Sequence, residues 1–256
     1  DDFINSLEVS AVFTGETTVC TTNCFSNILF LPGMMGSRLY EDEEELWVST
    51  SDTKHKKLIL GQDGKSLNNI YLLDDTQNLT DDGDELGIVD DVFSLNIYQS
   101  FINDLRDWKE EKIINDYHFI PYDWRLSLED IILNGKVQEE NISYTNAQEF
   151  EESFILKKLE ELQKSSKNGK VTIITHSNGG LIAKALVQKL KDTNNPLYEK
   201  IDKIIFIGVP QVGTPEAFIS LLHGVNVGKG FIMSANRARN IALNMPTIYN
   251  LLPSQN

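Results

Sequence analysis

A serine at a sharp turn is the residue best placed to do chemistry in this sequence. Ser177 follows the apolar run of "VTIITHSNGG" (171–180) and precedes residues with helical spacing. A strand, a tight turn that carries a serine, and a following helix make up the nucleophile elbow, which projects the hydroxyl from the carboxyl edge of a sheet. The alternative is a serine that only caps the helix.

The spacing of small residues around Ser177 tests this interpretation. The turn is crowded, so the residues two positions before and after the serine must be small. Gly179 meets this requirement, whereas Thr175 stands where glycine is usual and weakens the match. His176 directly precedes the serine and should point away from it, which makes it a packing residue rather than a general base.

An acyl-transfer site also needs backbone N–H groups that stabilise an oxyanion. Asn178 starts the helix after the serine, so its N–H can point at a developing negative charge. A second donor is expected in "FLPGMMG" (30–36), where Pro32-Gly33 turns the chain and leaves the N–H of Met34 free to face a cleft. An ordinary turn at a strand end is the alternative for this loop.

The elements that position these residues alternate between strands and helices. Strands are expected at 28–31, within 117–125, at 171–175 and at 203–210, and helices at 94–108, 146–165, 179–191, 215–222 and 234–244. The buried faces expected for the first two helices are Ile97, Phe101, Leu105 and Trp108, and Phe150, Phe154, Ile155, Leu159 and Leu162. Strands separated by helices predict a mostly parallel central sheet covered by helices, an α/β fold.

The chain divides into a short leader and one large unit. Residues 1–26 are rich in Thr, Ser and Asn and are interpreted as a leader or edge segment, and 27–256 as the α/β domain. Within it, 41–90 is acidic and punctuated by glycine, which predicts a loop-rich insertion. Its acidic runs "EDEEE" (41–45) and "DDGDE" (81–85) are expected to be solvated loops.

Composition narrows the classes of function. Hydrophobic residues make up 41% of the chain, and the formal net charge is −15. Such a negative field repels nucleic-acid phosphates and argues against docking on anionic membranes. No apolar run approaches the roughly 18 residues of a membrane span. Peripheral contact with a lipid surface stays open, as does the oligomeric state.

No cofactor is expected. The sequence carries neither a cluster of metal ligands nor a dinucleotide-binding loop. Cys20 and Cys24 have no nearby histidine or further cysteine, so they cannot complete a four-ligand zinc site. A local disulfide and two free thiols both remain open for this pair.

Several segments together resemble one family. The segments are "LPGMMGSRL" (31–39), "PYDWR" (121–125), "HSNGG" (176–180), "VPQVGTP" (209–215) and "MPTIYNLLP" (245–253). They are similar to the lecithin:cholesterol acyltransferase-like group of α/β-hydrolases, which includes lysosomal phospholipases and phospholipid:diacylglycerol acyltransferases. The likeness extends over about 27–254.

The resemblance implies an α/β-hydrolase fold and acyl transfer on a lipid ester by a Ser-Asp-His triad. Ser177 would attack the acyl carbonyl, and the backbone N–H groups of Met34 and Asn178 would hold the oxyanion. Water or an alcohol would then accept the acyl group. The resemblance also places Gly33, Asp123 and Arg125 near the pocket, with the last two expected to pair and hold their turn.

The sequence departs from the family where the acid and base of the triad belong. In this fold both follow the serine on loops after later strands, yet only one strand is expected after Ser177. The sole downstream histidine is His223, and the downstream aspartates Asp192 and Asp202 are not at the expected acid position. Three explanations stay open: a triad completed beyond Asn256, with the last strands lacking here, a catalytically inactive relative, or a dyad that uses His223 as base.

Two classes of function therefore compete. The first is a serine esterase, phospholipase or O-acyltransferase, and the second is an inactive α/β-hydrolase-like module that binds a lipid or a partner. The cysteine pair, the absence of an initiating methionine and the family resemblance together predict an exported protein, extracellular or in the cell envelope.

Overall fold

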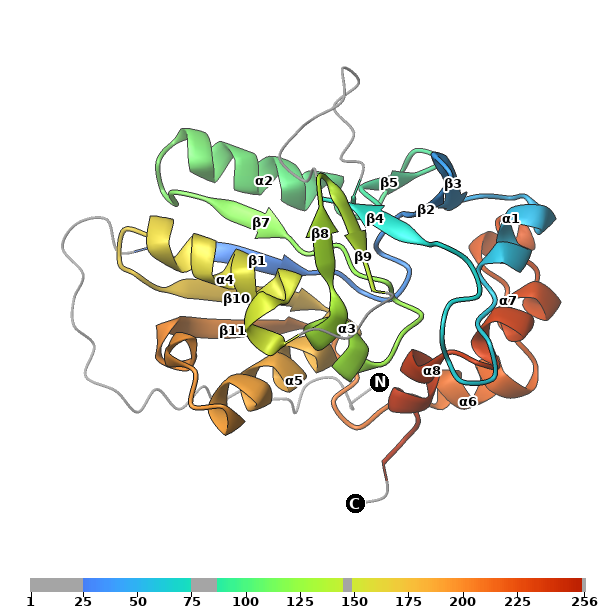
Figure 1. Ribbon diagram of the computed structural model, residues 1–256. Coiled ribbons are helices and arrows are strands. Elements are labelled where there is room, and N and C mark those ends of the chain that lie inside the picture. Colours follow the sequence, from blue (N-terminus) through green and yellow to red (C-terminus); the bar gives the residue numbers. More distant parts are fainter. Residues whose placement is uncertain (1–24, 75–86, 145–148, 255–256) are drawn as a thin grey trace, which may run out of the picture.

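A parallel sheet forms the centre of the computed structural model, which describes residues 25–74, 87–144 and 149–254 (Figure 1). Its strands are β1 (Asn27–Leu31), β7 (Tyr117–Phe119), β10 (Val171–His176) and β11 (Ile201–Ile207). They lie in the order β11-β10-β1-β7, and every neighbouring pair is parallel. The predicted α/β class with a parallel sheet is confirmed.

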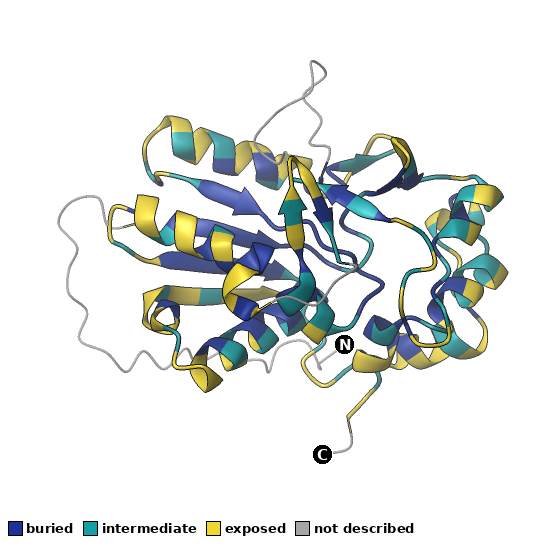
Figure 2. Cartoon of the chain, in the orientation of Figure 1, coloured by how far each residue is buried: buried dark blue, intermediate teal, exposed yellow. Residues whose placement is uncertain are grey.

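Helices cover both faces of this sheet. The helices involved are α2 (Gln99–Glu110), α3 (Leu128–Asn134), α4 (Phe154–Ser165) and α5 (Gly179–Asp192). On β1, Leu29 and Leu31 belong to the core that α3, α4 and α5 help to form, whereas Ile28 and Phe30 belong to the core beneath α2. This alternation follows from the two-residue period of a strand, and β1 is buried along its whole length (Figure 2).

The edge strand β11 differs from its neighbours, because both of its faces are open. Ile205, Phe206 and Ile207 are 42%, 40% and 49% exposed, although successive side chains point to opposite faces. Figure 2 shows the same contrast between β11 and the buried strands β1 and β10. A parallel strand normally has both faces covered, so β11 presents apolar surface that the described residues leave unburied.

A second, antiparallel sheet joins segments that are far apart in the sequence. Its strands are β2 (Leu39–Glu41), β3 (Glu44–Trp47), β4 (Tyr71–Leu73), β8 (Lys136–Gln138) and β9 (Asn141–Ser143), in the order β3-β2-β4-β9-β8. A two-stranded ribbon, β5 (Asp91–Val92) and β6 (Leu95–Asn96), lies outside it.

Short strands of this sheet interrupt the segment 41–90, but most of its described residues lie outside helices and strands, as expected for a loop-rich insertion. The acidic run 41–45 forms a hairpin rather than a loop: Glu41 ends β2, Asp42 and Glu43 adopt positive φ in the turn, and β3 follows. Its residues Asp42, Glu43 and Glu44 are exposed, as expected. Glycine is the usual residue for such φ values, which is why an all-acidic hairpin turn was not recognised in the sequence. The second acidic run, 81–85, lies outside the described residues, as do Cys20 and Cys24.

The last part of the chain is helical and packs beside a short helix from the N-terminal half. It contains α6 (Pro215–Leu222) and α7 (Ala235–Ala242), as the sequence indicated, and a third helix, α8 (Pro246–Asn250), that was not predicted. Helix α7 contacts α1 (Asp52–Lys57) (Figure 1). Short 3-10 helices are η1 (Phe150–Glu152), η2 (Pro196–Lys200) and η3 (Gly228–Gly230). Among the described residues, no helix is long and apolar enough to cross a bilayer.

Two helices differ from their predicted limits. The helix expected at 94–108 begins only at Gln99, so Ile97 precedes it and is exposed, as is Trp108. Leu105 is buried as predicted, together with Tyr98 and Ile102. The helix expected at 146–165 begins at Phe154, after η1. Its five predicted core residues are all buried.

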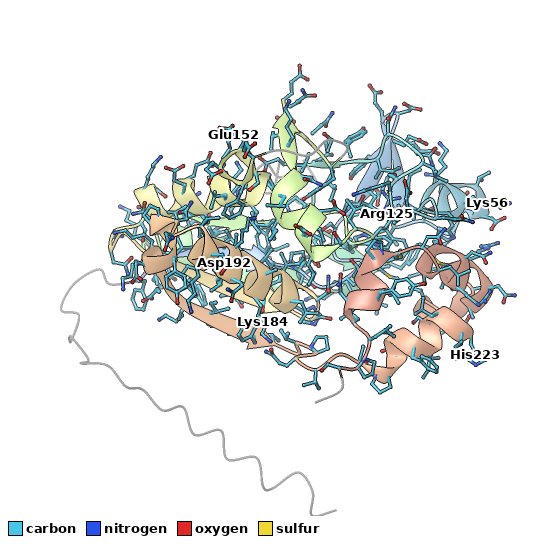
Figure 3. The ribbon with its side chains drawn as sticks, turned by 60° about the horizontal axis from the view of Figure 1, so that its bottom comes forward. Lys56, Arg125, Glu152, Lys184, Asp192 and His223 are labelled. Carbon is cyan, nitrogen blue, oxygen red and sulfur yellow. The ribbon has the colours of Figure 1, made fainter. Side chains whose placement is uncertain are left out.

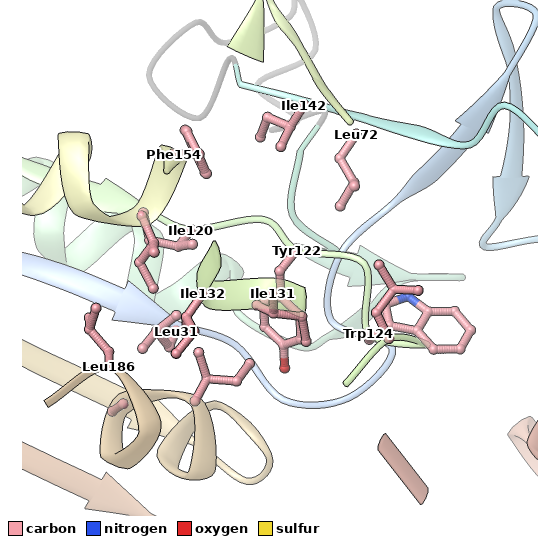
Figure 4. Close-up of a cluster of buried hydrophobic side chains, with 14 of the residues drawn as sticks. Leu31, Leu72, Ile120, Tyr122, Trp124, Ile131, Ile132, Ile142, Phe154 and Leu186 are labelled. Carbon is pink, nitrogen blue, oxygen red and sulfur yellow. The ribbon is translucent and has the colours of Figure 1, made fainter. Parts of the chain in front are cut away.

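The loop that follows β7 is fastened into the main core. Tyr122 and Trp124 are fully buried and lie close to Ile131, at the end of the strands (Figure 4). The indole N–H of Trp124 donates to the carbonyl of Ser37 over 3.1 Å. This bond joins the loop after β7 to the chain that follows β1, and both loops lie at the carboxyl edge of the sheet.

Helix α5 approaches β1 through a glycine. A Cβ atom placed on Gly179 would lie 2.3 Å from the carbonyl oxygen of Leu31 and 2.5 Å from that of Pro32. Such distances are far below van der Waals contact, so only glycine allows the helix to start this close to the strand. The small residue expected two positions after Ser177 is therefore required by backbone packing.

Replacing Gly179 with alanine should destabilise the fold, because the new methyl group overlaps backbone that cannot move without displacing β1. Overpacking of this kind costs roughly 1–3 kcal/mol. Urea unfolding followed by tryptophan fluorescence measures the loss. Gly61→Ala is the matched control, since its Cβ would approach closely only two side chains, the oxygen of Asp63 at 2.8 Å and a methyl group of Leu67 at 3.3 Å, and no backbone atom nearer than 3.7 Å. An equal loss in the two variants would contradict this packing account.

Candidate active site

Ser177 occupies a left-handed backbone conformation between β10 and α5. Its φ is 49°, which non-glycine residues rarely adopt and which costs of order 1–3 kcal/mol. The N–H of Ser177 donates to the carbonyl of Ile207 over 2.9 Å, so β11 holds the turn in place. Strain of this kind at a strand-to-helix serine is the geometry of a nucleophile elbow.

Thr175 replaces the usual glycine without disturbing this turn. Its side chain is buried, and its hydroxyl donates to the carbonyl of Ile205 in the neighbouring strand over 3.1 Å. The extra atoms therefore point toward β11 with their polar group satisfied, which explains how the elbow accommodates a residue larger than glycine.

The loop after β1 lies directly against the serine. We call residues 32–36 the Pro-Gly loop. A Cβ atom on Gly33 would lie 3.1 Å from the Cβ of Ser177, and the carbonyl of Gly33 accepts from the N–H of Gly36 over 3.0 Å. Met35 has a φ of 64°, so this loop, like the turn at Ser177, contains a residue in the left-handed conformation. The structure thus brings the two predicted oxyanion segments together at one edge of the sheet.

The two predicted oxyanion donors form no hydrogen bond within the described part of the chain. Neither the backbone N–H of Met34 nor that of Asn178 donates to an acceptor among the described residues. Both amides belong to turns beside Ser177, and Met34 shares a cavity with the serine. Backbone N–H groups left free beside a serine can accept a developing negative charge.

His176 contacts the Pro-Gly loop through a tyrosine rather than activating the serine. Its Nδ1 lies 2.8 Å from the hydroxyl of Tyr98, which also accepts the N–H of Gly33 over 2.9 Å. Burial lowers the pKa of His176 below its usual value. This arrangement agrees with the expectation of a packing residue, and no hydrogen bond joins His176 to the Ser177 hydroxyl in the described residues.

A second tyrosine reaches the same loop from the other side. The hydroxyl of Tyr122 donates to the carbonyl of Pro32 over 2.9 Å, and the side-chain amide of Asn178 donates to that hydroxyl over 3.4 Å. The roles of Tyr98 and Tyr122 were not predicted from the sequence. Tyr122 lies within the quoted "PYDWR" segment, whereas nothing in the helical spacing singled out Tyr98.

An apolar cavity of about 400 Å³ opens beside the serine. Ser177 lies at its boundary with side chains from the Pro-Gly loop, from Trp124 and from the C-terminal helices. The lining includes Met34, Met35, Trp124, Ser177, Glu216, Ala217, Met233, Ile241, Met245, Ile248 and Leu251. Methionines adapt their shape to irregular apolar ligands, so the cavity suits a flexible hydrocarbon chain.

Asp123 and Arg125 hold a turn and do not line this cavity. Arg125 donates to both carboxylate oxygens of Asp123, over 2.8 Å and 2.6 Å, and both side chains are buried. Arg125 also donates to the carbonyl of Leu58 over 3.1 Å. The expected pairing is therefore present. Trp124, between the two residues, lines the cavity, whereas Asp123 and Arg125 are not among its lining residues.

The structure does not bring His223 to the serine. His223 caps the end of α6, is exposed and is absent from the cavity lining, and Figure 3 shows it at the outer end of that helix. The side chain of Asp192 accepts from Gln188, and that of Asp202 from Ser26, both at a distance from the elbow. His223 is therefore not positioned to act as the base of a dyad with Ser177.

This chain is similar to a known protein family and to a solved structure. A model of the lecithin:cholesterol acyltransferase family matches residues 93–256. Among solved structures, the crystal structure of the Tle4-Tli4 complex contains a chain that matches with 17% sequence identity and a TM-score of 0.48. That alignment covers 90% of this chain and 54% of the other, so this chain spans about half the length of that structure. No curated protein sequence matches.

Removing the carboxylate of Asp123 should strongly destabilise the protein, because Arg125 would remain buried without its counter-ion. Breaking one half of a buried pair costs roughly 3–5 kcal/mol. Denaturant unfolding of Asp123→Ala measures this loss, and Asp123→Ala with Arg125→Met should recover part of it.

Glu152→Ala is the matched control, since it removes an exposed ion pair with Lys157. Its unfolding midpoint should stay close to that of the parent protein. A midpoint for Asp123→Ala that equals that of Glu152→Ala would contradict a structural role for the buried pair.

Proposed function

The chain belongs to the lecithin:cholesterol acyltransferase family, and we propose that its site transfers acyl groups from lipid esters through an acyl-serine intermediate on Ser177. The observation that carries this proposal is the strained serine at the wall of an apolar cavity, between two backbone N–H groups that have no acceptor among the described residues.

The chemistry follows from this geometry. The Ser177 oxygen attacks the acyl carbonyl while a general base takes its proton, and the carbonyl oxygen becomes an oxyanion held by the N–H groups of Met34 and Asn178. Collapse of this intermediate expels the alcohol, which takes up the proton and leaves the acyl group on the serine. Water or a second alcohol then attacks the acyl-serine, which releases an acid or a new ester.

The cavity supports an acyl chain as the occupant. Half of its lining residues are methionine, isoleucine, alanine or leucine, and Glu216 is the sole carboxylate among them. Each methylene buried there contributes about 0.8 kcal/mol. A long-chain ester would therefore bind better than acetate esters, in agreement with a lipid as substrate.

The general base and its acid partner are proposed to come from beyond Asn256. Among the described residues, no histidine lines the cavity. The open edge of β11 supports this source, because further parallel strands paired there would bring crossover helices that cover Ile205, Phe206 and Ile207. Loops after such strands would reach the carboxyl edge of the sheet, where Ser177 lies.

A catalytically inactive binding module is the second candidate function. The observation that favours it is the same lack of a histidine beside Ser177 in the described residues. Such a module would hold a lipid in the cavity without forming a covalent intermediate, so covalent labelling of the serine separates the two candidates.

A fluorophosphonate should label the longest natural form of the protein at Ser177, because it captures serines that are activated and held beside an oxyanion hole. The site is identified by mass spectrometry, and Ser177→Ala must abolish the label. The 1–256 chain should react at least about 1,000-fold more slowly, since a serine without its base retains little nucleophilicity. Absence of label on the longest natural form would overturn the enzyme in favour of the binding module.

An exposed apolar surface beside the cavity supports contact with a lipid surface. Phe93 and Phe231 are 60% and 72% exposed, and their rings meet edge to face with centroids 5.5 Å apart. Phe231 donates its N–H to the carbonyl of Gly228, which lines the cavity. With a net charge of −15, the protein should favour neutral over anionic lipid.

Replacing Phe93 and Phe231 with serine should weaken binding to phosphatidylcholine vesicles by at least about tenfold, since a buried phenylalanine contributes roughly 1.5–3 kcal/mol. Vesicle co-sedimentation measures the partition. Phe25→Ser is the matched control, because Phe25 is 62% exposed but precedes β1, at the opposite edge of the sheet. Equal losses at both sites would contradict a lipid surface beside the cavity.

A further inference from the structure

One peptide unit of the Pro-Gly loop has both of its polar atoms bound by tyrosine hydroxyls. The N–H of Gly33 donates to the Tyr98 hydroxyl over 2.9 Å, and the Tyr122 hydroxyl donates to the carbonyl of Pro32 over 2.9 Å. The carbonyl and the N–H of one peptide lie on opposite sides of a rigid plane. Two bonds at opposite ends therefore fix the rotation of that plane.

Each tyrosine is also tied to a residue that flanks Ser177. Tyr98 is bonded to Nδ1 of His176, immediately before the serine, over 2.8 Å. Tyr122 accepts from the side chain of Asn178, immediately after it, over the longer distance of 3.4 Å. The loop and the elbow are thus joined twice, once on either side of the serine.

The protonation states of these groups give each chain of bonds a direction. Burial raises the pKa of Tyr98 and of Tyr122, so both hydroxyls keep their protons. Burial lowers the pKa of His176, which favours the neutral imidazole. In the tautomer with Nδ1 unprotonated, the Tyr98 hydroxyl donates its proton to Nδ1 while its oxygen accepts the N–H of Gly33. The Tyr122 hydroxyl accepts from Asn178 and donates to Pro32.

We propose that Tyr98 and Tyr122 form a clamp on the Pro32–Gly33 peptide that positions the N–H of Met34 toward Ser177. This inference rests on the proposed function, in which that N–H binds the oxyanion. The tyrosines do not touch the reacting atoms: they are positioning residues. We call these two hydroxyls, with their bonds to the loop, the tyrosine clamp.

The path from the clamp to Met34 runs through two adjacent peptide planes. The clamp fixes the first plane, between Pro32 and Gly33. The second plane carries the carbonyl of Gly33, held by the N–H of Gly36, and on its opposite side the N–H of Met34. With both planes fixed, the Met34 N–H keeps one direction although the loop contains glycine, whose backbone is the most permissive.

The proposal predicts that loss of either hydroxyl frees the loop and slows the chemical step. In Tyr98→Phe the Gly33 N–H loses its acceptor, so its hydrogen exchange, followed by NMR, should accelerate roughly tenfold. With a long-chain ester, kcat of the longest natural form should fall by roughly 10- to 100-fold, as for other small misplacements of catalytic groups. KM should stay within about twofold, because the oxyanion contact exists only in the transition state.

Matched variants distinguish a loss of positioning by the tyrosine hydroxyls from a nonspecific loss of activity. Tyr122→Phe should also lower kcat, and His176→Leu should resemble Tyr98→Phe, whereas His176→Asn, which keeps an acceptor near the Nδ1 position, should lose less. Tyr71→Phe is the control: its hydroxyl accepts the N–H of Glu43 in the antiparallel sheet, and its removal should leave kcat unchanged.

The outcomes distinguish this proposal from the proposed function. Faster exchange at Gly33 together with lower kcat supports the clamp. Unchanged exchange in Tyr98→Phe overturns it, and so does faster exchange with unchanged kcat. If the parent protein neither reacts with a fluorophosphonate nor turns over ester, the proposed function fails, and the clamp as a catalytic device fails with it. In that case exchange at Gly33 still shows whether the tyrosine holds the loop.

Discussion

The left-handed backbone of Ser177 is the constraint on which the rest of this site depends. Such a conformation persists only where the surroundings fix it. At Ser177, hydrogen bonding and close packing both hold the turn. The turn donates its N–H to Ile207, and Gly179 presses against the carbonyls of Leu31 and Pro32. Gly33 then fits against the serine from the other side. The serine, the helix that starts behind it and the loop in front of it are consequently one packed unit, in which no part can shift alone.

The same packing ties the site to the open edge of the sheet. The carbonyl that holds Ser177 belongs to β11, whose side chains Ile205, Phe206 and Ile207 remain exposed among the described residues. Whatever buries that strand would therefore also stiffen the elbow. The proposed extension beyond Asn256 would then have two roles, since it would supply the proposed base and complete the support of Ser177.

The sequence was sufficient to predict the elements with strong local signals. The apolar run before "HSNGG", the helix behind it and the parallel sheet were all predictable, because buried strands and amphipathic helices carry their own periodicity. The antiparallel sheet was not, since strands such as β4 and β9 have three residues each and pair across a long separation. Tyr98 was missed for a related reason: it lies just before α2 begins, so its contact with His176 is purely tertiary.

The central claim is that Ser177 is a nucleophile whose oxyanion is held by the backbone N–H groups of Met34 and Asn178. A crystal structure of the longest natural form after reaction with a long-chain alkyl fluorophosphonate tests it most directly. The account predicts phosphorus bonded to the Ser177 oxygen, a phosphoryl oxygen about 2.7–3.1 Å from both nitrogens, and the alkyl chain in the apolar cavity. An adduct whose phosphoryl oxygen faces solvent, away from both amides, would contradict it.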